Sequence, residues 1–337
     1  KDLRNVMYIV KSKLMNREDD ILFFNTIKGL LPMEDGVFDM KIRKFRERTK
    51  EDYFSFSLKQ TYNPNYDKEY VHQYIGSLVC KEGEYNQELV LQVLELIGYS
   101  FTGEGNLKTI LLFKGEGNNG KSLLLKMIKT MMDQYCKAAH KKIYKKQRFE
   151  NNTHEAHLVQ MIGARCATVP ELDEKDEFYA DSLKSFSGGD EIQIRNCGSD
   201  HTFNVTIVAV LMIACNEVSK FQDRVLEKRL ACIQFVNTFE KNAEKADEIL
   251  SHINDIFSGF LDGAYRYYQN KKNIVILPQI KDYTKSIADS KDSFIQFIEE
   301  ETYEKGDDKE YCKNIYYVYL NFCKVSDMNP DGKEIFY

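Results

Sequence analysis

The sequence predicts an α/β fold: a three-layer α/β domain with a mainly helical region before it and a small helical module after it. Three patterns support this prediction. From Lys108 onward, short apolar segments alternate with stretches of helical periodicity, which is typical of a layered α/β domain. Before that point, apolar residues recur at helical spacing over residues 71–99. After Pro278, residues 292–300 and 315–323 have the pattern of two amphipathic helices.

The composition is that of a globular protein. Of the 337 residues, 43% are hydrophobic and 29% charged, and only 5 are proline, which excludes a disordered or fibrous chain. The apolar run over residues 207–215 is far shorter than the roughly 20 residues of a membrane-spanning helix, and we expect no contact with a membrane. A net charge of −5 excludes a uniformly basic nucleic-acid coat but leaves room for a local basic channel.

The cysteines and the chain ends indicate the setting of the protein. No two of the 8 cysteines have the C-x2-C spacing, and several fall in apolar runs. This pattern predicts reduced, mostly buried thiols in a cytoplasmic protein, and neither disulfides nor a zinc site. The chain begins without methionine and ends within an apparent helix, so we expect it to be a piece of a longer protein.

Changes in the pattern of apolar, polar and turn-forming residues divide the chain into five units. They are a mixed α/β region over residues 1–74, a helical unit over 75–106, the α/β domain over 107–240, a helical extension over 241–288 and a C-terminal module over 289–337. The expected strands of the α/β domain are Thr109–Phe113, Cys166–Val169, Thr206–Cys215 and Leu230–Val236.

Residues 115–122 read GEGNNGKS and fit the phosphate-binding pattern G-x4-G-K-[ST]. An apolar strand precedes them and a helix follows, which is the context that the pattern requires. Glycines let backbone N–H groups converge on phosphate oxygens, and Lys121 and Ser122 are of the types that hold the β/γ-phosphates and Mg²⁺. The alternative, a glycine-rich loop with an incidental lysine, does not account for the flanking strand and helix. The predicted nucleotide-binding residues are Gly115, Gly117, Asn118, Asn119, Gly120, Lys121, Ser122 and Leu123.

Two further strand ends supply polar groups. The strand ending at Val169 leads into a cluster of carboxylates, of which Glu171 comes first and Asp173 is the second candidate. A carboxylate there would hold Mg²⁺ together with Ser122 and orient the attacking water. Asn216 follows the next strongly apolar strand, where an amide can contact the γ-phosphate or that water. The alternatives are a solvated acidic loop and an asparagine that only forms a turn.

Arg229 stands directly before the last expected strand. In a ring-forming ATPase, an arginine here can act on the γ-phosphate held by the neighbouring subunit. The alternative is an ordinary surface ion pair. Arg224 is the second candidate for this role.

These motifs, in this order, resemble those of superfamily 3 helicases, and most closely the primase–helicases of poxviruses, other large DNA viruses, satellite phages and plasmids. The segments Leu31–Asp39 and Leu183–Arg195 are also similar to this family. The resemblance implies an AAA+-like P-loop ATPase domain, an oligomerising collar before it and the start of a winged-helix module after it. No catalytic motif of the family's primase is present, so a primase domain is expected on an N-terminal part outside this sequence.

The resemblance also implies what the protein does. It predicts a viral or mobile-element ATP-dependent DNA helicase that forms a homo-hexamer, hydrolyses ATP with Mg²⁺ between subunits and grips single-stranded DNA in a central channel. Arg195 and His201, on a hairpin over residues 191–205, are then the DNA-binding residues, although the hairpin alone could be purely structural. The rival interpretation is an AAA+-like motor that remodels proteins or packages DNA without unwinding it.

Overall fold

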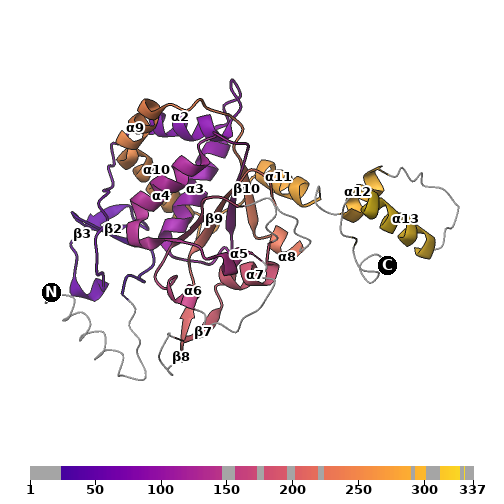
Figure 1. The fold of residues 1–337 in the computed structure, drawn as a ribbon. Coiled ribbons are helices and arrows are strands. Elements are labelled where there is room, and N and C mark those ends of the chain that lie inside the picture. The colour runs from indigo at the N-terminus through magenta and orange to yellow at the C-terminus, as the bar shows by residue number, and fades with distance from the viewer. Residues whose placement is uncertain are drawn as a thin grey trace.

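The computed structural model describes residues 24–145, 156–172, 178–195, 202–218, 224–289, 293–300, 312–326 and 330. Its strands are β1 Leu30–Met33, β2 Gly36–Asp39, β3 Lys44–Arg46, β4 Ile110–Lys114, β5 Cys136–Ala138, β6 Cys166–Val169, β7 Glu191–Arg195, β8 Thr202–Thr206, β9 Val210–Cys215 and β10 Leu230–Gln234. Its helices are α2 Lys68–Val79, α3 Gln87–Thr102, α4 Lys121–Met132, α5 Lys141–Tyr144, α6 Ala156–Val159, α7 Ala180–Gly188, α8 Arg224–Glu227, α9 Ala243–Ser251, α10 Ile253–Gln269, α11 Pro278–Asp289, α12 Ser293–Glu300 and α13 Cys312–Val325 (Figure 1).

A five-stranded sheet lies at the centre, with the strand order β10-β4-β9-β6-β5. All neighbouring strands in it are parallel, and Lys114 at the end of β4 pairs with Cys215 at the end of β9. The carboxyl ends of β4, β6 and β9 therefore meet at one edge of the sheet. The α/β prediction is confirmed, and β4, β6 and β10 lie within two residues of their predicted bounds. The strand predicted over Thr206–Cys215 was too long: β9 begins at Val210, because Thr206 ends the hairpin strand β8. The fifth, β5, has only three residues and too little apolar pattern to be predicted.

Helices cover both faces of this sheet, which makes the three layers. Alternate residues of a strand point to opposite faces, so Leu111 and Phe113 of β4 join one buried cluster, whereas Ile110 and Leu112 join the other. The first cluster is completed by α2, α3, α4 and α10. The second is completed by α5, α7, α8 and α11. The predicted three-layer arrangement is therefore present.

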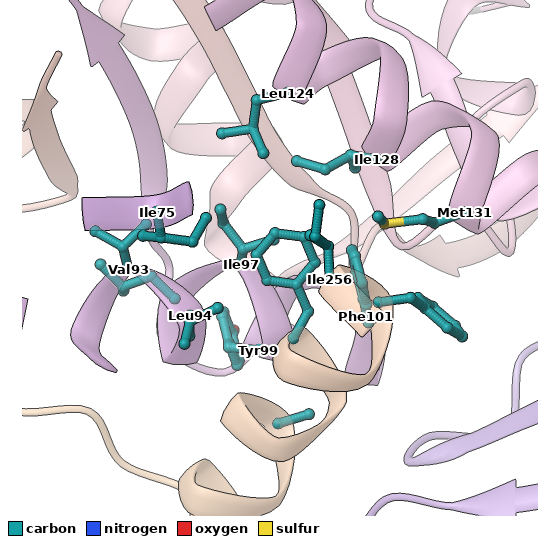
Figure 2. Close-up of a cluster of buried hydrophobic side chains, with 14 of the residues drawn as sticks. Ile75, Val93, Leu94, Ile97, Tyr99, Phe101, Leu124, Ile128, Met131 and Ile256 are labelled. Carbon is teal, nitrogen blue, oxygen red and sulfur yellow. The ribbon is translucent and has the colours of Figure 1, made fainter. Parts of the chain in front are cut away.

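The helical unit before the α/β domain shares its core with the phosphate-loop helix α4. Figure 2 shows Leu124, Ile128 and Met131 of α4 against Ile97 and Phe101 of α3. All five side chains are buried. Because one continuous core joins these helices, α2 and α3 are held in a fixed place beside the loop that follows β4.

Helices α3 and α10 approach so closely that only glycine fits at their contact. A Cβ on Gly98 of α3 would lie 2.1 Å from the carbonyl oxygen of Phe260 and 2.5 Å from the nitrogen of Ala264. A Cβ on Gly263 of α10 would lie 2.2 Å from the carbonyl oxygen of Leu94. These are backbone atoms that cannot move aside without separating the two helices.

We expect Gly98→Ala to destabilise the protein by about 1–3 kcal/mol because the added methyl group forces α3 away from α10. The measurement is the free energy of unfolding in urea, followed by circular dichroism. Gly76→Ala is the matched control, since its Cβ would meet only the ring of the exposed Tyr85 at 3.0 Å and the side chain of Val90. That variant should be neutral or gain up to about 1 kcal/mol from helix propensity. If Gly98→Ala is as stable as the parent, this helix contact is not the one present in solution.

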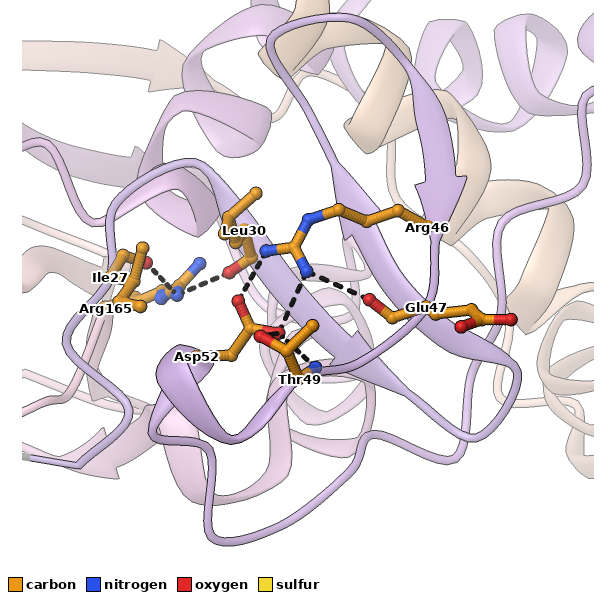
Figure 3. A network of polar contacts seen from close by, with 7 residues as sticks. All are labelled: Ile27, Leu30, Arg46, Glu47, Thr49, Asp52 and Arg165. Atoms are coloured by element: carbon orange, nitrogen blue, oxygen red, sulfur yellow. Dashed lines mark hydrogen bonds and ion pairs between the residues drawn. The ribbon is translucent and has the colours of Figure 1, made fainter.

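A three-stranded antiparallel sheet, β1-β2-β3, lies on the flank of the main body (Figure 1). One arginine fastens it. Arg165, directly before β6, donates to the carbonyl oxygens of Ile27, just before β1, at 2.9 Å and of Leu30, the first residue of β1, at 2.7 Å. It also donates to the carbonyl oxygen of Phe101 in α3 at 2.8 Å. Figure 3 shows the first two of these bonds. Arg165 thus joins the flanking sheet, α3 and the central sheet.

The predicted hairpin is present as β7 and β8, an antiparallel pair in which Glu191 is opposite Thr206 and Arg195 opposite Thr202. It projects from the lower end of the body (Figure 1).

At the C-terminal end, α12 and α13 form the two predicted amphipathic helices. They pack around Phe297 and Tyr319, and the Ser293 and Tyr319 hydroxyls lie 2.6 Å apart. Two helices alone do not establish a winged-helix fold. None of the described helices is long and apolar enough to cross a bilayer.

Candidate nucleotide-binding site

The loop between β4 and α4 has the backbone conformation of a phosphate cradle. Asn118 and Gly120 both adopt positive φ, 60° and 88°, and Gly120 caps the amino end of α4. A Cβ on Gly120 would lie 2.7 Å from Leu78, whereas one on Gly117 would meet nothing within 4 Å. The loop is therefore packed on one side against α2 and open at Gly117. Free N–H groups and the helix dipole at this end favour an anion.

Lys121 is the buried cation of the site, with only 6% of its surface exposed. Its ammonium donates to the carbonyl oxygens of Gly115 and Glu116, the latter at 3.0 Å, and to the Asn119 side-chain oxygen at 2.9 Å. Burial, with a smaller contribution from Lys114, lowers the pKa of Lys121 below its ordinary value. Four neutral oxygens, including one on Asn216, hold the charge, and none of these partners is a carboxylate. An anion at this position would gain a strong, poorly screened attraction.

Asn216 and Glu171 reach the same place from the two neighbouring strands. The Asn216 side-chain oxygen lies 3.3 Å from the Lys121 ammonium, because Asn216 directly follows β9, beside β4. Glu171 follows β6 by two residues, and the Leu172 nitrogen donates to the Ala214 carbonyl oxygen at 3.0 Å, which fixes this turn against β9. Glu171 is exposed and lines a cavity over the loop.

A cavity of about 650 Å³ opens over the loop. Residues 117–123 form its floor, and Glu171, Cys215 and Asn216 line one end. The other end lies between α2 and α9, where aromatic and aliphatic side chains form an apolar part and Gln73, Lys245 and Glu248 add polar and charged groups. Burial raises the pKa of the Cys215 thiol to about 12, so this group is neutral beside Lys121. The cavity is thus cationic over the loop and largely apolar, with some charged groups, between α2 and α9.

The residues present fit a nucleoside triphosphate with Mg²⁺. A Cβ built on Gly117 meets no atom within 4 Å, so there is open space beside the backbone where phosphate oxygens could lie. Mg²⁺ in such sites takes one or two protein oxygens and otherwise phosphate and water oxygens. Ser122 and Glu171, both lining the cavity, are that kind of donor set. Among the described residues there is no cluster of three or more metal-ligating side chains, so an ion would depend on the phosphates.

Arg229 lies away from this cavity. Its backbone carbonyl accepts from the Ile110 nitrogen at 2.8 Å, which places it at the amino edge of the sheet, opposite to the phosphate loop. Its guanidinium donates to the Lys184 carbonyl oxygen and, at 3.1 Å, to the Ser187 hydroxyl of α7. Arg229 therefore does not join Lys121, Glu171 and Asn216 within one chain.

Four predicted residues are not placed with their side chains, among them Arg224, of which only the backbone, at the start of α8, is described. Asp173 and His201 lie outside the described residues, and so does the side chain of Arg195, although its backbone ends β7. Their predicted roles stay predictions.

The sequence reasoning missed the apolar half of the cavity. Tyr70, Tyr74 and Leu78 come from α2, and Phe239 and Ile249 come from the segment after β10 and from α9. In the sequence they look like ordinary amphipathic helix positions. The only hint was that Tyr70, Tyr74 and Leu78 recur at an interval of four, which also fits a helix facing the core.

Comparison with known proteins places the chain among helicase-like sequences. Residues 113–229 match a family of unknown function, DUF5906. The chain is 24% identical over 217 residues to a protein of Acanthamoeba polyphaga mimivirus named "Putative helicase L207/L206", and 26% identical over 204 residues to "Putative helicase 121R" of Invertebrate iridescent virus 3. These matches cover 64% and 58% of this chain but only 22% and 21% of the relatives. The chain thus spans about a fifth of their length.

The fold is also similar to a solved structure. The apo form of the C-terminal region of NrS-1 aligns with 95% of this chain and 77% of its own, with a TM-score of 0.52 and 12% identity. At that identity the similarity concerns the fold alone. The two sequence relatives, both named putative helicases of viruses, confirm the predicted resemblance to viral helicases.

Proposed function

We propose, from the relation to viral helicases, that this chain is the helicase part of a replicative primase–helicase of superfamily 3, an ATP-dependent motor that moves on DNA. The observation that carries the proposal is the meeting of Lys121, Asn216 and Glu171 around one cavity over a phosphate-type loop. These are the cation, the polar sensor and the carboxylate that nucleotide hydrolysis requires. We propose that this activity takes place in the host cytoplasm, or in a viral factory if the protein is viral.

In this proposal each side chain has one task. Backbone N–H groups of the loop and the Lys121 ammonium hold the β- and γ-phosphates, exchanging the loop oxygens that Lys121 now contacts for phosphate oxygens. Ser122 and Glu171 would hold Mg²⁺, which neutralises charge on the phosphates when bound. Glu171 orients the attacking water and accepts its proton, with Asp173 as the alternative. Asn216 contacts the γ-phosphate or that water.

Arg229 is proposed to act on a neighbouring subunit. Its place at the amino edge of the sheet, far from its own phosphate loop, supports this assignment. The guanidinium would leave its contacts with α7 when a second subunit presents a triphosphate. In a homo-hexamer of this kind, single-stranded DNA passes through the central channel and contacts Arg195 and His201 of the hairpin.

The test is the steady-state rate of ATP hydrolysis with and without single-stranded DNA, together with the particle mass by light scattering. We expect hydrolysis to be stimulated by the DNA and to be carried by particles of ring size. Double-stranded DNA at the same phosphate concentration is the control, because it presents similar charge without a free strand.

The alternative function is an AAA+-like motor that remodels proteins or packages DNA without unwinding it. It shares the cavity and its loop, so it also predicts ATP hydrolysis. A ring that hydrolyses ATP at the same rate with and without single-stranded DNA would favour this alternative over the helicase.

A further inference from the structure

The cavity extends beyond the phosphate loop and the proposed catalytic residues. Leu78, at the carboxyl end of α2, packs against Gly120 of the loop. Tyr70 lies eight residues earlier on the same helix, which is about 12 Å farther along its axis. Both residues line the cavity. The cavity therefore extends from the phosphate loop along α2, and its far part is the slot between α2 and α9.

The slot is joined firmly to the loop. The Phe239 nitrogen donates to the carbonyl oxygen of Asn118 at 2.7 Å, and the Asn237 side chain donates to the carbonyl oxygens of Ser77 and Cys80 at the end of α2, at 2.8 and 2.7 Å. The segment after β10 thus joins the carboxyl end of α2 to the phosphate loop, and it leads directly into α9, the other wall of the slot. A ligand anchored in the loop enters the slot in a fixed direction.

The aromatic lining of the slot is supported from behind. The His252 ring, just after α9, stacks on Tyr70 with the ring centroids 3.9 Å apart and the planes 26° apart. His252 is itself held by Asp255, whose carboxylate lies 3.0 Å from its Nδ1. One face of the Tyr70 ring is therefore occupied by a fixed partner, which holds the ring in one orientation while the residue still lines the cavity.

We propose that the slot between α2 and α9 holds the nucleoside, with the base stacked on Tyr70 and with His252 as a positioning residue behind it. This inference rests on the proposed nucleotide site and deepens it. A flat aromatic base fits a largely apolar slot that has a fixed ring on its wall, and the anionic end of the same ligand fits the cationic floor at Lys121. The polar and charged side chains that also line the slot, such as Gln73 and Glu248, can accept or donate hydrogen bonds at the polar edge of a base.

The test compares ATP with inorganic tripolyphosphate, which has the anionic part of the ligand and no base. In Tyr70→Ala, we expect the affinity for ATP to fall about 5- to 100-fold, the loss that removal of one base–aromatic stack produces, while the affinity for tripolyphosphate stays unchanged. Tyr70→Phe should bind ATP as the parent does. Tyr85→Ala, which removes an exposed tyrosine that does not line the cavity, is the control.

The role of His252 has its own readout. His252→Ala should weaken ATP binding less than Tyr70→Ala does, and His252→Phe should restore it, because a second flat ring again supports Tyr70. The affinity for tripolyphosphate should be the same in the parent, His252→Ala and His252→Phe. Equal ATP affinity in the parent and His252→Ala, or failure of phenylalanine to restore it, overturns the positioning role.

A spectroscopic probe is available because the chain contains no tryptophan. Tyr70→Trp places the only tryptophan of the chain in the slot, and we expect ATP, but not tripolyphosphate, to quench the tryptophan fluorescence by stacking. If Tyr70→Ala and the parent bind ATP equally well, the base lies elsewhere and the slot proposal is wrong while the phosphate site stands. If the parent binds neither ligand, the nucleotide site itself is wrong.

Discussion

Lys121→Ala is expected to lower the rate of ATP hydrolysis by at least about 10²–10³-fold, the loss that follows removal of one electrostatic contact to a transition state. The ammonium lies at the end of β4, 3.3 Å from the Asn216 oxygen and directly over the loop carbonyls. Lys241 and Lys245 also line the cavity, but they come from α9 and the segment before it and not from the loop. We therefore expect neither to replace the charge of Lys121 on the γ-phosphate. Hydrolysis is measured at saturating ATP, and ATP binding is measured separately.

The matched control is Lys126→Ala, which removes an exposed lysine from the same helix α4. It should leave the rate unchanged. Lys121→Arg tests the shape of the cation as well as its charge: the planar guanidinium cannot occupy the pocket formed by three loop oxygens, so we expect it to be nearly as inactive. Near-normal hydrolysis by a well-folded Lys121→Ala would remove the nucleotide-site assignment.

The polar half of the site could be predicted because its signals are local. The loop pattern fits within eight residues, and Glu171 and Asn216 each stand just after an apolar strand. Parallel strands bring their carboxyl ends to one edge, so the strand order alone places these residues together. The hairpin β7–β8 was predictable for the same reason, since two short alternating segments flank a turn.

The apolar half could not be predicted because its parts are far apart in the sequence. Tyr70 and Ile249 meet across the slot only once α3 and α10 are packed, and that packing depends on backbone contacts at Gly98 and Gly263. A glycine within a helix gives no sign of what it will approach. The three residues of β5 are likewise specified by their neighbours β6 and α4, and hardly by their own pattern.

Arg165 is the clearest case of a residue whose role is invisible in the sequence, and its replacement is expected to have the largest effect on stability. Only 2% of its surface is exposed, although arginine is almost never buried so completely without a carboxylate partner. Its donors go to three backbone carbonyl oxygens, and its guanidinium lies 4.1 Å from the centre of the Tyr135 ring. The carbonyl oxygens and the face of the ring stabilise the buried positive charge in place of a carboxylate.

We therefore expect Arg165→Met to destabilise the protein by about 3–5 kcal/mol, because the apolar side chain fills the space but leaves the buried carbonyls of Leu30 and Phe101 and the partly buried carbonyl of Ile27 without this donor. Urea unfolding followed by circular dichroism measures the change. Arg165→Lys should recover only part of the loss, since a single ammonium cannot span the carbonyls of Ile27, Leu30 and Phe101. Arg43→Met is the control.

The loss of stability in Arg165→Met is to be compared with that in Arg43→Met. Arg43 pairs with Asp262 at 3.3 Å, but its side chain is 41% exposed, and Asp262 keeps hydrogen bonds from Tyr62 and Tyr66. Its loss should cost at most about 1 kcal/mol. If Arg165→Met costs no more than that, the three carbonyls must find other donors, and the flanking sheet β1-β2-β3 is held by its apolar contacts with the core. If only Arg165→Met loses much stability, the Arg165 side chain fixes this sheet to β6, the strand that leads to Glu171.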